Sequence, residues 1–265
     1  MNKQNKDTEI DVGSGTPEEK WLEDPLVYYV KRNHLELLKV IQLKGQLILD
    51  AGCGPGTYGI ILAEAGNEVV GLEISPEGIK VAGQRAKEKK VSLYPVAGDL
   101  EKLPFEDNSF DICFCGWVLH HFPGITDSMV ELIRVLKPGG KIALAEPNES
   151  NLAMRFSRFV EDLPVLRRWT LNAGWDTPNR TVHRHEYYIK EMEQHGIEDI
   201  QFTSCFPGGL PPLIIKSQKQ GLPPLSRVLI HILFYLRRLI FITAFKVLPR
   251  PLNGADLLVT GVKRK

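Results

Sequence analysis

The feature that most constrains the fold is a regular alternation of short apolar runs with helical stretches between residues 46 and 146. Five such runs are bounded by glycine, proline or acidic residues: 46–50, 68–73, 91–96, 111–115 and 141–145. Continuously apolar runs are typical of parallel strands that are covered on both faces. Strands and helices that alternate at this spacing predict right-handed βαβ units. Ser75 is predicted to cap one of these helices, which begins at Pro76. We therefore expect an α/β fold built on a mostly parallel sheet.

The alternation stops after Glu146. A helix is predicted at 185–195, ended by Gly196, and two further strands at 198–206 and 255–262. We divide the chain into an N-terminal tail with cap helices (1–45), a core (46–146), and helical insertions that share the last two strands of the same domain (147–265).

Composition excludes some classes of function. The formal net charge is +1, so the overall field gives no reason to expect nucleic-acid binding. Four cysteines are present without a CxxC pair, and we expect buried thiols in a reducing cytoplasm and no metal site. Residues 1–15 are polar and lack the apolar region of a secretory signal. The oligomeric state is left open.

A glycine-rich loop follows the first predicted strand. It reads Leu49-Asp-Ala-Gly-Cys-Gly-Pro-Gly-Thr57, and Glu73 ends the second strand nearly twenty residues later. Glycines let the backbone approach a ligand closely, and an acid at this distance accepts hydrogen bonds from ribose hydroxyls. The run 54–59 formally matches the dinucleotide signature GxGxxG. The charge of Asp50 disfavours a pyrophosphate and suits an ammonium or sulfonium compound. A tight turn without a ligand is the third reading.

Further motifs make a resemblance specific. The loop is followed by Gly98-Asp-Leu100, Leu103-Pro-Phe105, Asn108-Ser-Phe-Asp111, Val118-Leu-His-His-Phe122 and Arg134-Val-Leu-Lys-Pro-Gly-Gly140. In order and spacing, these motifs resemble class I S-adenosylmethionine-dependent methyltransferases, especially the ubiquinone and menaquinone methyltransferase-like group. The resemblance covers about residues 46–146. It implies a Rossmann-like seven-stranded, mostly parallel sheet with an antiparallel last strand, helices on both faces, and helical additions.

The resemblance also implies roles for individual residues around S-adenosyl-L-methionine. Asp50, Gly52 and Gly54 of the loop, together with Gly116, would lie along the methionine end. Cys53 and Gly56 of the same loop would also border the cofactor. Glu73 would hold the ribose hydroxyls. Asp99 would bind the adenine amino group, with Ile74 and Leu100 against the two faces of the ring. Core packing is the alternative for Ile74 and Leu100, and a turn-forming Asx cap is the alternative for Asp99.

The methyl donor is already an activated leaving group, so no nucleophilic triad is needed. The protein must hold the acceptor in line with the methyl group and keep water out. His120 and His121 follow the fourth strand, at the sheet edge where ligands bind in open α/β folds. Either one is a candidate catalytic base, and a structural or cofactor-shaping role is the alternative. Tyr28, Tyr29 and His34 could belong to a lid, with plain packing as the alternative.

The acceptor side is marked by an apolar stretch. Residues 225–247 are broadly apolar apart from Arg227, His231, Arg237, Arg238 and Lys246. The central arginine pair argues against a spanning helix. The segment could be a cover helix, the wall of an apolar acceptor pocket, or a peripheral membrane contact. We expect a small, apolar or lipid-like acceptor and a cytoplasmic protein, with membrane association left open.

Two other functions compete with methyl transfer to a small molecule. One is a catalytically silent S-adenosylmethionine-binding protein, which an intact loop does not exclude. The other is an NAD-dependent oxidoreductase, which only the GxGxxG spacing favours.

The His120→Ala and His121→Ala substitutions are expected to lower the rate of methyl transfer more than the affinity for the cofactor, because a base acts in the reaction step. Calorimetric binding and turnover, measured on the same preparations, check this. Unchanged turnover in both variants would remove these histidines from the mechanism.

Overall fold

The computed structural model describes residues 44–151, 155, 159, 181, 183–205, 239, 243 and 256–265. The helices expected before residue 42, with Tyr28, Tyr29 and His34, lie outside this part of the chain. So do most of the insertions expected at 147–182 and 207–250.

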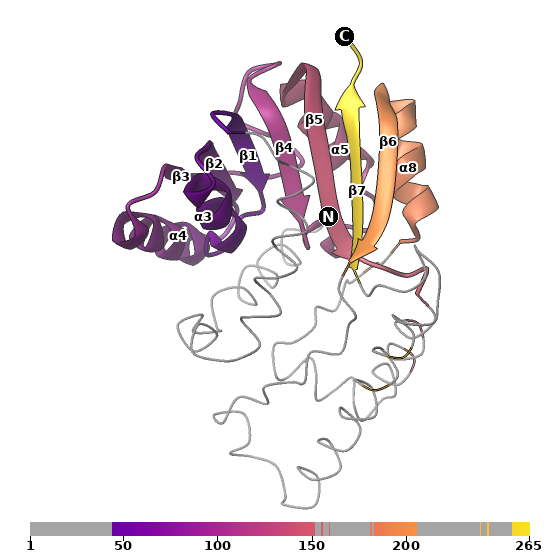
Figure 1. Ribbon diagram of the computed structural model, residues 1–265, viewed down its shortest axis with the longest axis horizontal. Helices are drawn as coiled ribbons and strands as arrows, with labels where there is room; N and C mark the ends of the chain where they lie inside the picture. The colour runs from indigo at the N-terminus through magenta and orange to yellow at the C-terminus, as the bar shows by residue number, and fades with distance from the viewer. Residues whose placement is uncertain are drawn as a thin grey trace, which may run out of the picture.

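The described strands form one seven-stranded sheet in the order β3-β2-β1-β4-β5-β7-β6 (Figure 1). They are β1 (Leu47–Ala51), β2 (Glu68–Glu73), β3 (Leu93–Ala97), β4 (Phe110–Gly116), β5 (Leu136–Pro147), β6 (Ile197–Cys205) and β7 (Asp256–Lys263). Strands β1 to β5 are parallel, and β7 is antiparallel to both β5 and β6. The predicted α/β architecture and its antiparallel last strand are confirmed.

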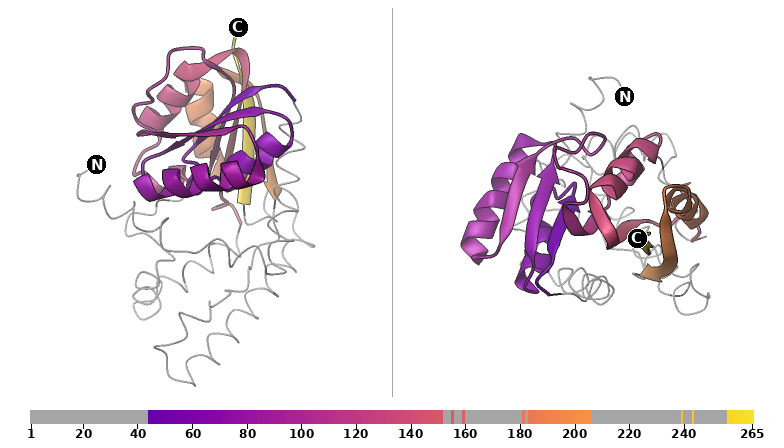
Figure 2. Two further views of the ribbon diagram at one scale, coloured as in Figure 1. Left: turned by 90° about the vertical axis from the view of Figure 1, so that its left-hand side faces the viewer. Right: turned by 90° about the horizontal axis from the view of Figure 1, so that it is seen from above.

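Helices cover both faces of the sheet (Figure 2). Helices α3 (Thr57–Glu64) and α4 (Pro76–Lys89) pack on one face, and α5 (Thr126–Val135) and α8 (His185–Gln194) pack on the other. The short 3-10 helix η2 (Leu119–His121) follows β4 directly. Because the faces are covered, ligands can approach the sheet only at its edges.

Strand β1 shows why the sequence adopts this arrangement. Its side chains alternate between the two faces, so Ile48 belongs to the apolar cluster under α3, and Leu49 belongs to the cluster under α5. Helix α4 begins as predicted, since the Ser75 hydroxyl accepts a hydrogen bond from the Gly78 amide at 3.2 Å and Pro76 follows it. Local caps therefore agree with the tertiary packing.

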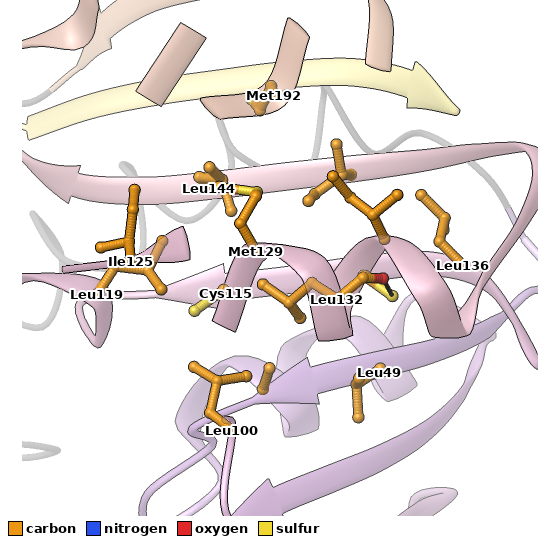
Figure 3. Close-up of a cluster of buried hydrophobic side chains, with 14 of the residues drawn as sticks. Leu49, Leu100, Cys115, Leu119, Ile125, Met129, Leu132, Leu136, Leu144 and Met192 are labelled. Atoms are coloured by element: carbon orange, nitrogen blue, oxygen red, sulfur yellow. Dashed lines mark hydrogen bonds between the residues drawn. The ribbon is translucent and has the colours of Figure 1, made fainter. Parts of the chain in front are cut away.

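The larger core lies between the sheet and helices α5 and α8 (Figure 3). Met129 and Leu132 of α5 point toward Leu144 of β5 and Leu49 of β1, and all four are buried. Full burial of one such side chain contributes about 1.5–3 kcal/mol. Cys113 and Cys115 are buried in the same core, which confirms that they share a face of β4.

The fifth strand is longer than predicted. It begins at Leu136 and not at residue 141, and its first part includes the turn-like sequence Lys137-Pro-Gly-Gly140. Leu136 pairs with Phe110, and the register then shifts before Lys141 pairs with Ile112. The prediction was wrong here because Leu136 already pairs with β4, and residues 137–140 form the irregular stretch between the two paired positions.

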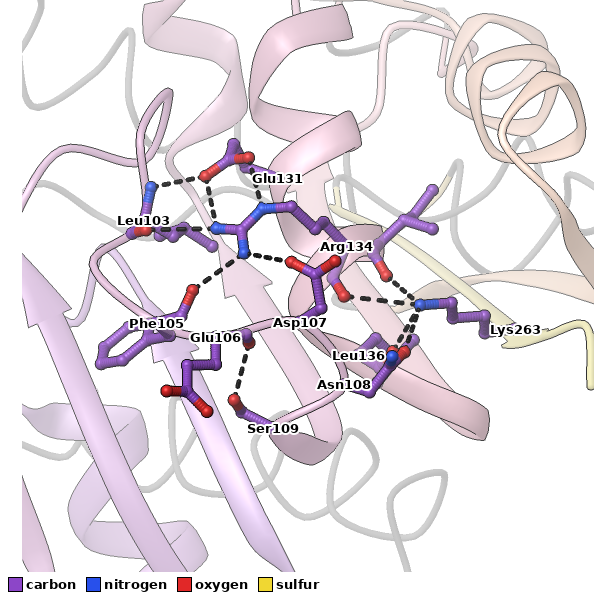
Figure 4. A network of polar contacts seen from close by, with 11 residues as sticks. Leu103, Phe105, Glu106, Asp107, Asn108, Ser109, Glu131, Arg134, Leu136 and Lys263 are labelled. Atoms are coloured by element: carbon purple, nitrogen blue, oxygen red, sulfur yellow. Dashed lines mark hydrogen bonds and ion pairs between the residues drawn. The ribbon is translucent and has the colours of Figure 1, made fainter.

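Arg134, at the end of α5, closes the loop between β3 and β4 (Figure 4). Its guanidinium donates to both carboxylate oxygens of Glu131, to Asp107, and to the carbonyl oxygens of Leu103 and Phe105 at 2.7–3.2 Å. Guanidinium geometry suits this multidentate binding. The motifs that contain Arg134, Leu103 and Phe105 therefore stabilise the fold at the amino edge of the sheet.

The Arg134→Ala substitution is expected to lower the free energy of unfolding by about 1–3 kcal/mol, because the loop carbonyls and Glu131 lose their donor. Urea unfolding measures this. The surface pair of Lys80 and Glu77 provides a control, and Lys80→Ala should change stability by less than about 0.5 kcal/mol. Equal effects of the two substitutions would contradict the role of Arg134 in stabilising the loop between β3 and β4.

Candidate functional site

The glycine loop lies at the carboxyl ends of the parallel strands. The Gly52 and Cys53 amides both donate to the Leu72 carbonyl of β2, at 2.8 and 2.9 Å. Gly52 has a φ of 75°, and a Cβ atom there would lie 2.4 Å from the Val118 side chain after β4. Only glycine fits this position without strain. The loop therefore joins the ends of β1, β2 and β4.

Two loop residues differ in their surroundings. The Cys53 side chain is buried against Gly71 of β2, and burial raises the pKa of its thiol, which stays protonated. The Cys53 side chain therefore packs on the sheet, and only the backbone of Cys53 can contact a ligand at the loop. Gly54 has a φ of 51°, and a Cβ atom there would meet no described atom within 4 Å. Open space at Gly54 leaves room for a ligand.

Glu73 organises the loop from the end of β2. One carboxylate oxygen accepts from the Gly54 amide and the other from the Ser75 amide, both at 2.8 Å. The Glu73 carbonyl also accepts from the Gly98 amide at 3.0 Å. A carboxylate oxygen has two lone pairs, so each oxygen retains the capacity for another hydrogen bond. Glu73 can therefore hold the loop and two hydroxyls at once.

Asp50 is buried beneath the loop with 2% of its surface exposed. It accepts a hydrogen bond from the Gly59 amide, but its Oδ2 atom has no partner among the described residues. Burial, with a further contribution from the charge of Glu73, raises the pKa of the Asp50 carboxyl to about 7. A nearby cation would stabilise the ionised form. Asp50 lies beside the loop, as the sequence predicted. Burial without a neighbouring cation in the described part of the chain makes the ionised form of its carboxyl unfavourable.

The residues expected around an adenine ring have different environments. Ile74 is 40% exposed, so core packing does not explain it. Leu100 is 5% exposed and belongs to the larger core, as its alternative reading held. Asp99 accepts from the Glu101 amide at 3.1 Å, which is the Asx turn considered as its alternative. These three roles stay predictions, since a turn carboxylate can still accept from a ligand.

The end of β4 contains an unusual backbone conformation. Trp117, directly after Gly116, has a φ of 55°, which is uncommon for a residue with a side chain. Its ring stacks on Tyr58 with centroids 5.2 Å apart, and its Nε1 donates to Asp256 at 3.3 Å. Burial raises the pKa of Asp256 to about 7. Such strain persists where surrounding contacts determine it, and it often marks functional sites.

His120 and His121 follow in η2. Their ring centroids lie 4.0 Å apart, and His120 is 8% exposed. The Nδ1 atom of His120 lies 2.8 Å from the Oε2 atom of Glu146. The structure thus brings both predicted histidines to the same edge as the loop, and it ties one of them to a carboxylate.

Glu146 is the residue that sequence reasoning missed. It follows the fifth apolar run directly, and Glu73 stands at the end of the second. This similarity in position could have marked Glu146 as a site residue from the sequence alone. The charge of Glu146 also reaches His183, whose pKa burial lowers, and Tyr188 of α8. The His183 Nε2 and Tyr188 hydroxyl are buried without hydrogen-bond partners in the described ranges. Helix α8 begins at His185, which confirms the predicted start of this helix.

The described residues contain no group of three or more His, Cys, Asp or Glu side chains that could hold a metal ion. The groups that meet at the carboxyl edge are instead hydrogen-bond acceptors, backbone amides and imidazoles. They suit an organic ligand with hydroxyl groups and a positive charge.

The Asp50→Asn substitution is expected to stabilise the protein at pH 8 and to have little effect near pH 4. The folded-state pKa of Asp50 is about 7, and its ordinary value is 3.8. A raised pKa means that stability falls as the pH rises from about 4 to 7. Since each pKa unit corresponds to about 1.4 kcal/mol, the gain at pH 8 is at most about 4 kcal/mol.

Urea unfolding at both pH values measures this gain. Asp199→Asn, at an exposed position, serves as the control for removing a surface charge. Equal stability of Asp50→Asn and the unmodified protein at pH 8 would show that the Asp50 charge carries no penalty.

Comparison with known proteins places this site in a family. Residues 49–144 match the model of a methyltransferase domain. The demethylmenaquinone methyltransferase of Geobacillus sp. strain WCH70 is 34% identical over 137 residues, which are 50% of this chain and 54% of that protein. The chain thus spans about half the length of the first curated relatives that it matches.

A longer match exists with the demethylmenaquinone methyltransferase of Staphylococcus haemolyticus. It is 30% identical over 202 residues, which are 68% of this chain and 80% of that protein. The solved structure of Haemonchus contortus phosphoethanolamine N-methyltransferase 2 in complex with S-adenosyl-L-methionine shares the fold, with a TM-score of 0.62 and 21% identity over 89% of this chain and 53% of that chain. The chain therefore belongs to the class I S-adenosylmethionine-dependent methyltransferases.

Proposed function

We propose that this protein transfers a methyl group from S-adenosylmethionine to a small, apolar acceptor of the quinol type. The observation that carries the proposal is the meeting of the glycine loop, Glu73 and the two histidines at one sheet edge. The relatives named demethylmenaquinone methyltransferases support the acceptor class. Family membership argues against the oxidoreductase that the GxGxxG spacing left open.

The residues at this edge fit the cofactor. Among the described residues the Oδ2 atom of buried Asp50 has no partner, and this suits a ligand with positive charge. The space beside Gly54 accommodates its methionine end, and Glu73 retains the capacity to accept from both ribose hydroxyls. The exposed Ile74 offers an apolar surface to the adenine.

When bound, the cofactor supplies a methyl group on a positively charged sulfur, which leaves as a neutral thioether. The protein then has two tasks, which are to hold the acceptor atom in line with the carbon–sulfur bond and to exclude water. The η2 turn lies next to the loop through the contact between Val118 and Gly52. It is therefore suited to face the acceptor.

The acceptor-binding part of the chain lies mainly outside the described residues. The apolar segment 225–247 supports a lipid-like acceptor on its sequence alone, either as a pocket wall or as a contact with a membrane surface. Among the helices that the structure describes, none is long and apolar enough to cross a membrane.

Turnover with different acceptors tests the proposal. With labelled S-adenosylmethionine, a short-chain demethylmenaquinol should gain the label and S-adenosylhomocysteine should form in equal amount. Phosphoethanolamine, a polar acceptor, should not react. Calorimetry should show binding of S-adenosylmethionine and no binding of NAD.

The outcomes separate the candidate functions. The protein could bind the cofactor but methylate neither the quinol nor any compound in an extract of lipid-soluble acceptors. This result would favour the silent binding protein, since the loop and Glu73 are needed for cofactor binding alone. Absence of cofactor binding would overturn the proposal altogether.

A further inference from the structure

Glu146 is a buried carboxylate whose hydrogen bonds with the described residues go to Val118, Leu119 and His120, at the start of η2. It lies near the end of β5, and its side chain is 1% exposed. Its Oε1 atom accepts from the Val118 and Leu119 amides at 2.9 and 2.8 Å. Its Oε2 atom accepts from the His120 amide at 3.3 Å and contacts the His120 ring Nδ1 at 2.8 Å. One side chain thus sets the position of the whole η2 turn.

This arrangement determines which nitrogen of His120 carries the proton. An ionised carboxylate only accepts hydrogen bonds, so the Nδ1 atom must be the donor. In neutral histidine the other nitrogen, Nε2, then has a free lone pair. Three backbone amides also donate to the two oxygens of Glu146, so its side chain acts as an acceptor throughout this segment. Glu146 therefore favours the form of His120 that can take up a proton at Nε2.

The same turn lies beside the glycine loop. Val118, which donates its amide to Glu146, also packs against Gly52. The carbonyl of His120 accepts from the Thr181 amide at 2.7 Å, so the turn is held from the insertion side as well. Other titratable groups surround the pair: His121 of η2, Cys115 of β4, His183 before α8, Tyr188 of α8 and Asp256 of β7.

We propose that Glu146 is a positioning residue for methyl transfer, and that it fixes the Nδ1–H tautomer of His120 so that Nε2 accepts the proton of the acceptor hydroxyl. This inference rests on the proposed function. The acceptor O–H bond breaks, its proton goes to Nε2, and its electron pair moves into the ring. The nucleophilic ring carbon forms the new bond to the methyl group, and the carbon–sulfur pair leaves with sulfur. The ring carbon then loses its proton to solvent water, and the oxygen regains the proton held on His120 Nε2, so that one proton is released for each methyl group transferred.

The Glu146→Gln substitution separates positioning from packing. The amide keeps the volume of the side chain and an oxygen for the Val118 and Leu119 amides. Its NH₂ group, however, opposes Nδ1 with a donor and favours the other tautomer. In Ser-His-Asp hydrolases, the equivalent change of carboxylate to amide lowers kcat by about 10⁴-fold through the wrong tautomer. We expect kcat to fall by about 10²–10⁴-fold with the demethylmenaquinol, and the Kd for S-adenosylmethionine to stay within about threefold.

A double-mutant cycle tests whether Glu146 acts through His120. In the His120→Ala background, Glu146→Gln should cause no further loss of kcat, because the group on which it acts is gone. A loss equal to that in the unmodified protein would overturn the proposal. Glu191→Gln is the matched control, since Glu191 is a buried carboxylate that accepts from the Thr126 hydroxyl at 3.0 Å, away from η2. It should leave kcat unchanged.

A spectroscopic measurement makes the inference independent of turnover. Nitrogen-15 NMR of histidine-labelled protein reports which ring nitrogen is protonated, and His120→Gln identifies the signal. We expect Nδ1–H in the unmodified protein and Nε2–H in Glu146→Gln. The proposal fails if His120 carries its proton on Nε2 in the unmodified protein. If the tautomer is as expected but no acceptor is methylated, the proposed function fails and the positioning of His120 by Glu146 stands.

His120→Asn provides a second variant in case Glu146→Gln does not fold. The asparagine amide replaces Nδ1–H as donor to Glu146 but provides nothing in place of Nε2. The variant should fold and bind S-adenosylmethionine, with kcat lowered by about 10²-fold or more. Turnover equal to that of the unmodified protein would overturn the proton-accepting role of His120.

Discussion

Hydrogen bonds from backbone amides to carboxylates at strand ends are the interaction on which the site depends. Glu73 at the end of β2 holds Gly54 and Ser75, and Glu146 near the end of β5 holds the η2 turn. Because β2 and β5 are parallel, both carboxylates meet the loops at the same edge. Charge-assisted hydrogen bonds of this kind are about twice as strong as neutral ones, so they can fix the backbone of these two loops.

The site contains two buried carboxyl groups whose ionised forms the fold leaves unfavourable. Asp50 and Asp256 are both carboxylates whose pKa burial raises to about 7. The apolar packing of Leu49 and Leu144 with helix α5 stabilises the central strands and so offsets the unfavourable burial of these carboxylates. A cationic ligand near Asp50 would offset part of its penalty, so ligand binding and stability are coupled at this position.

Much of the architecture follows from sequence periodicity. The central strands were predicted within about two residues because each is a continuous apolar run, and the cap at Ser75 was predicted from its local pattern. The start of β5 was missed, since Leu136 pairs with β4 before the irregular stretch 137–140, which the local pattern marks as a turn. Of the site, the loop, Glu73 and the two histidines were found from motifs, but Glu146 was not.

The sequence by itself determined the order of strands and helices and the chemical types present at each strand end, because these depend on local pattern and spacing. Only the tertiary structure decided which of these groups touch. It placed Ile74 in solvent and Leu100 in the core, although both are apolar residues at the ends of neighbouring strands. It also joined His120 to a carboxylate 26 residues away. Such contacts depend on strand order and register, which bring distant residues together through the packing of the whole sheet.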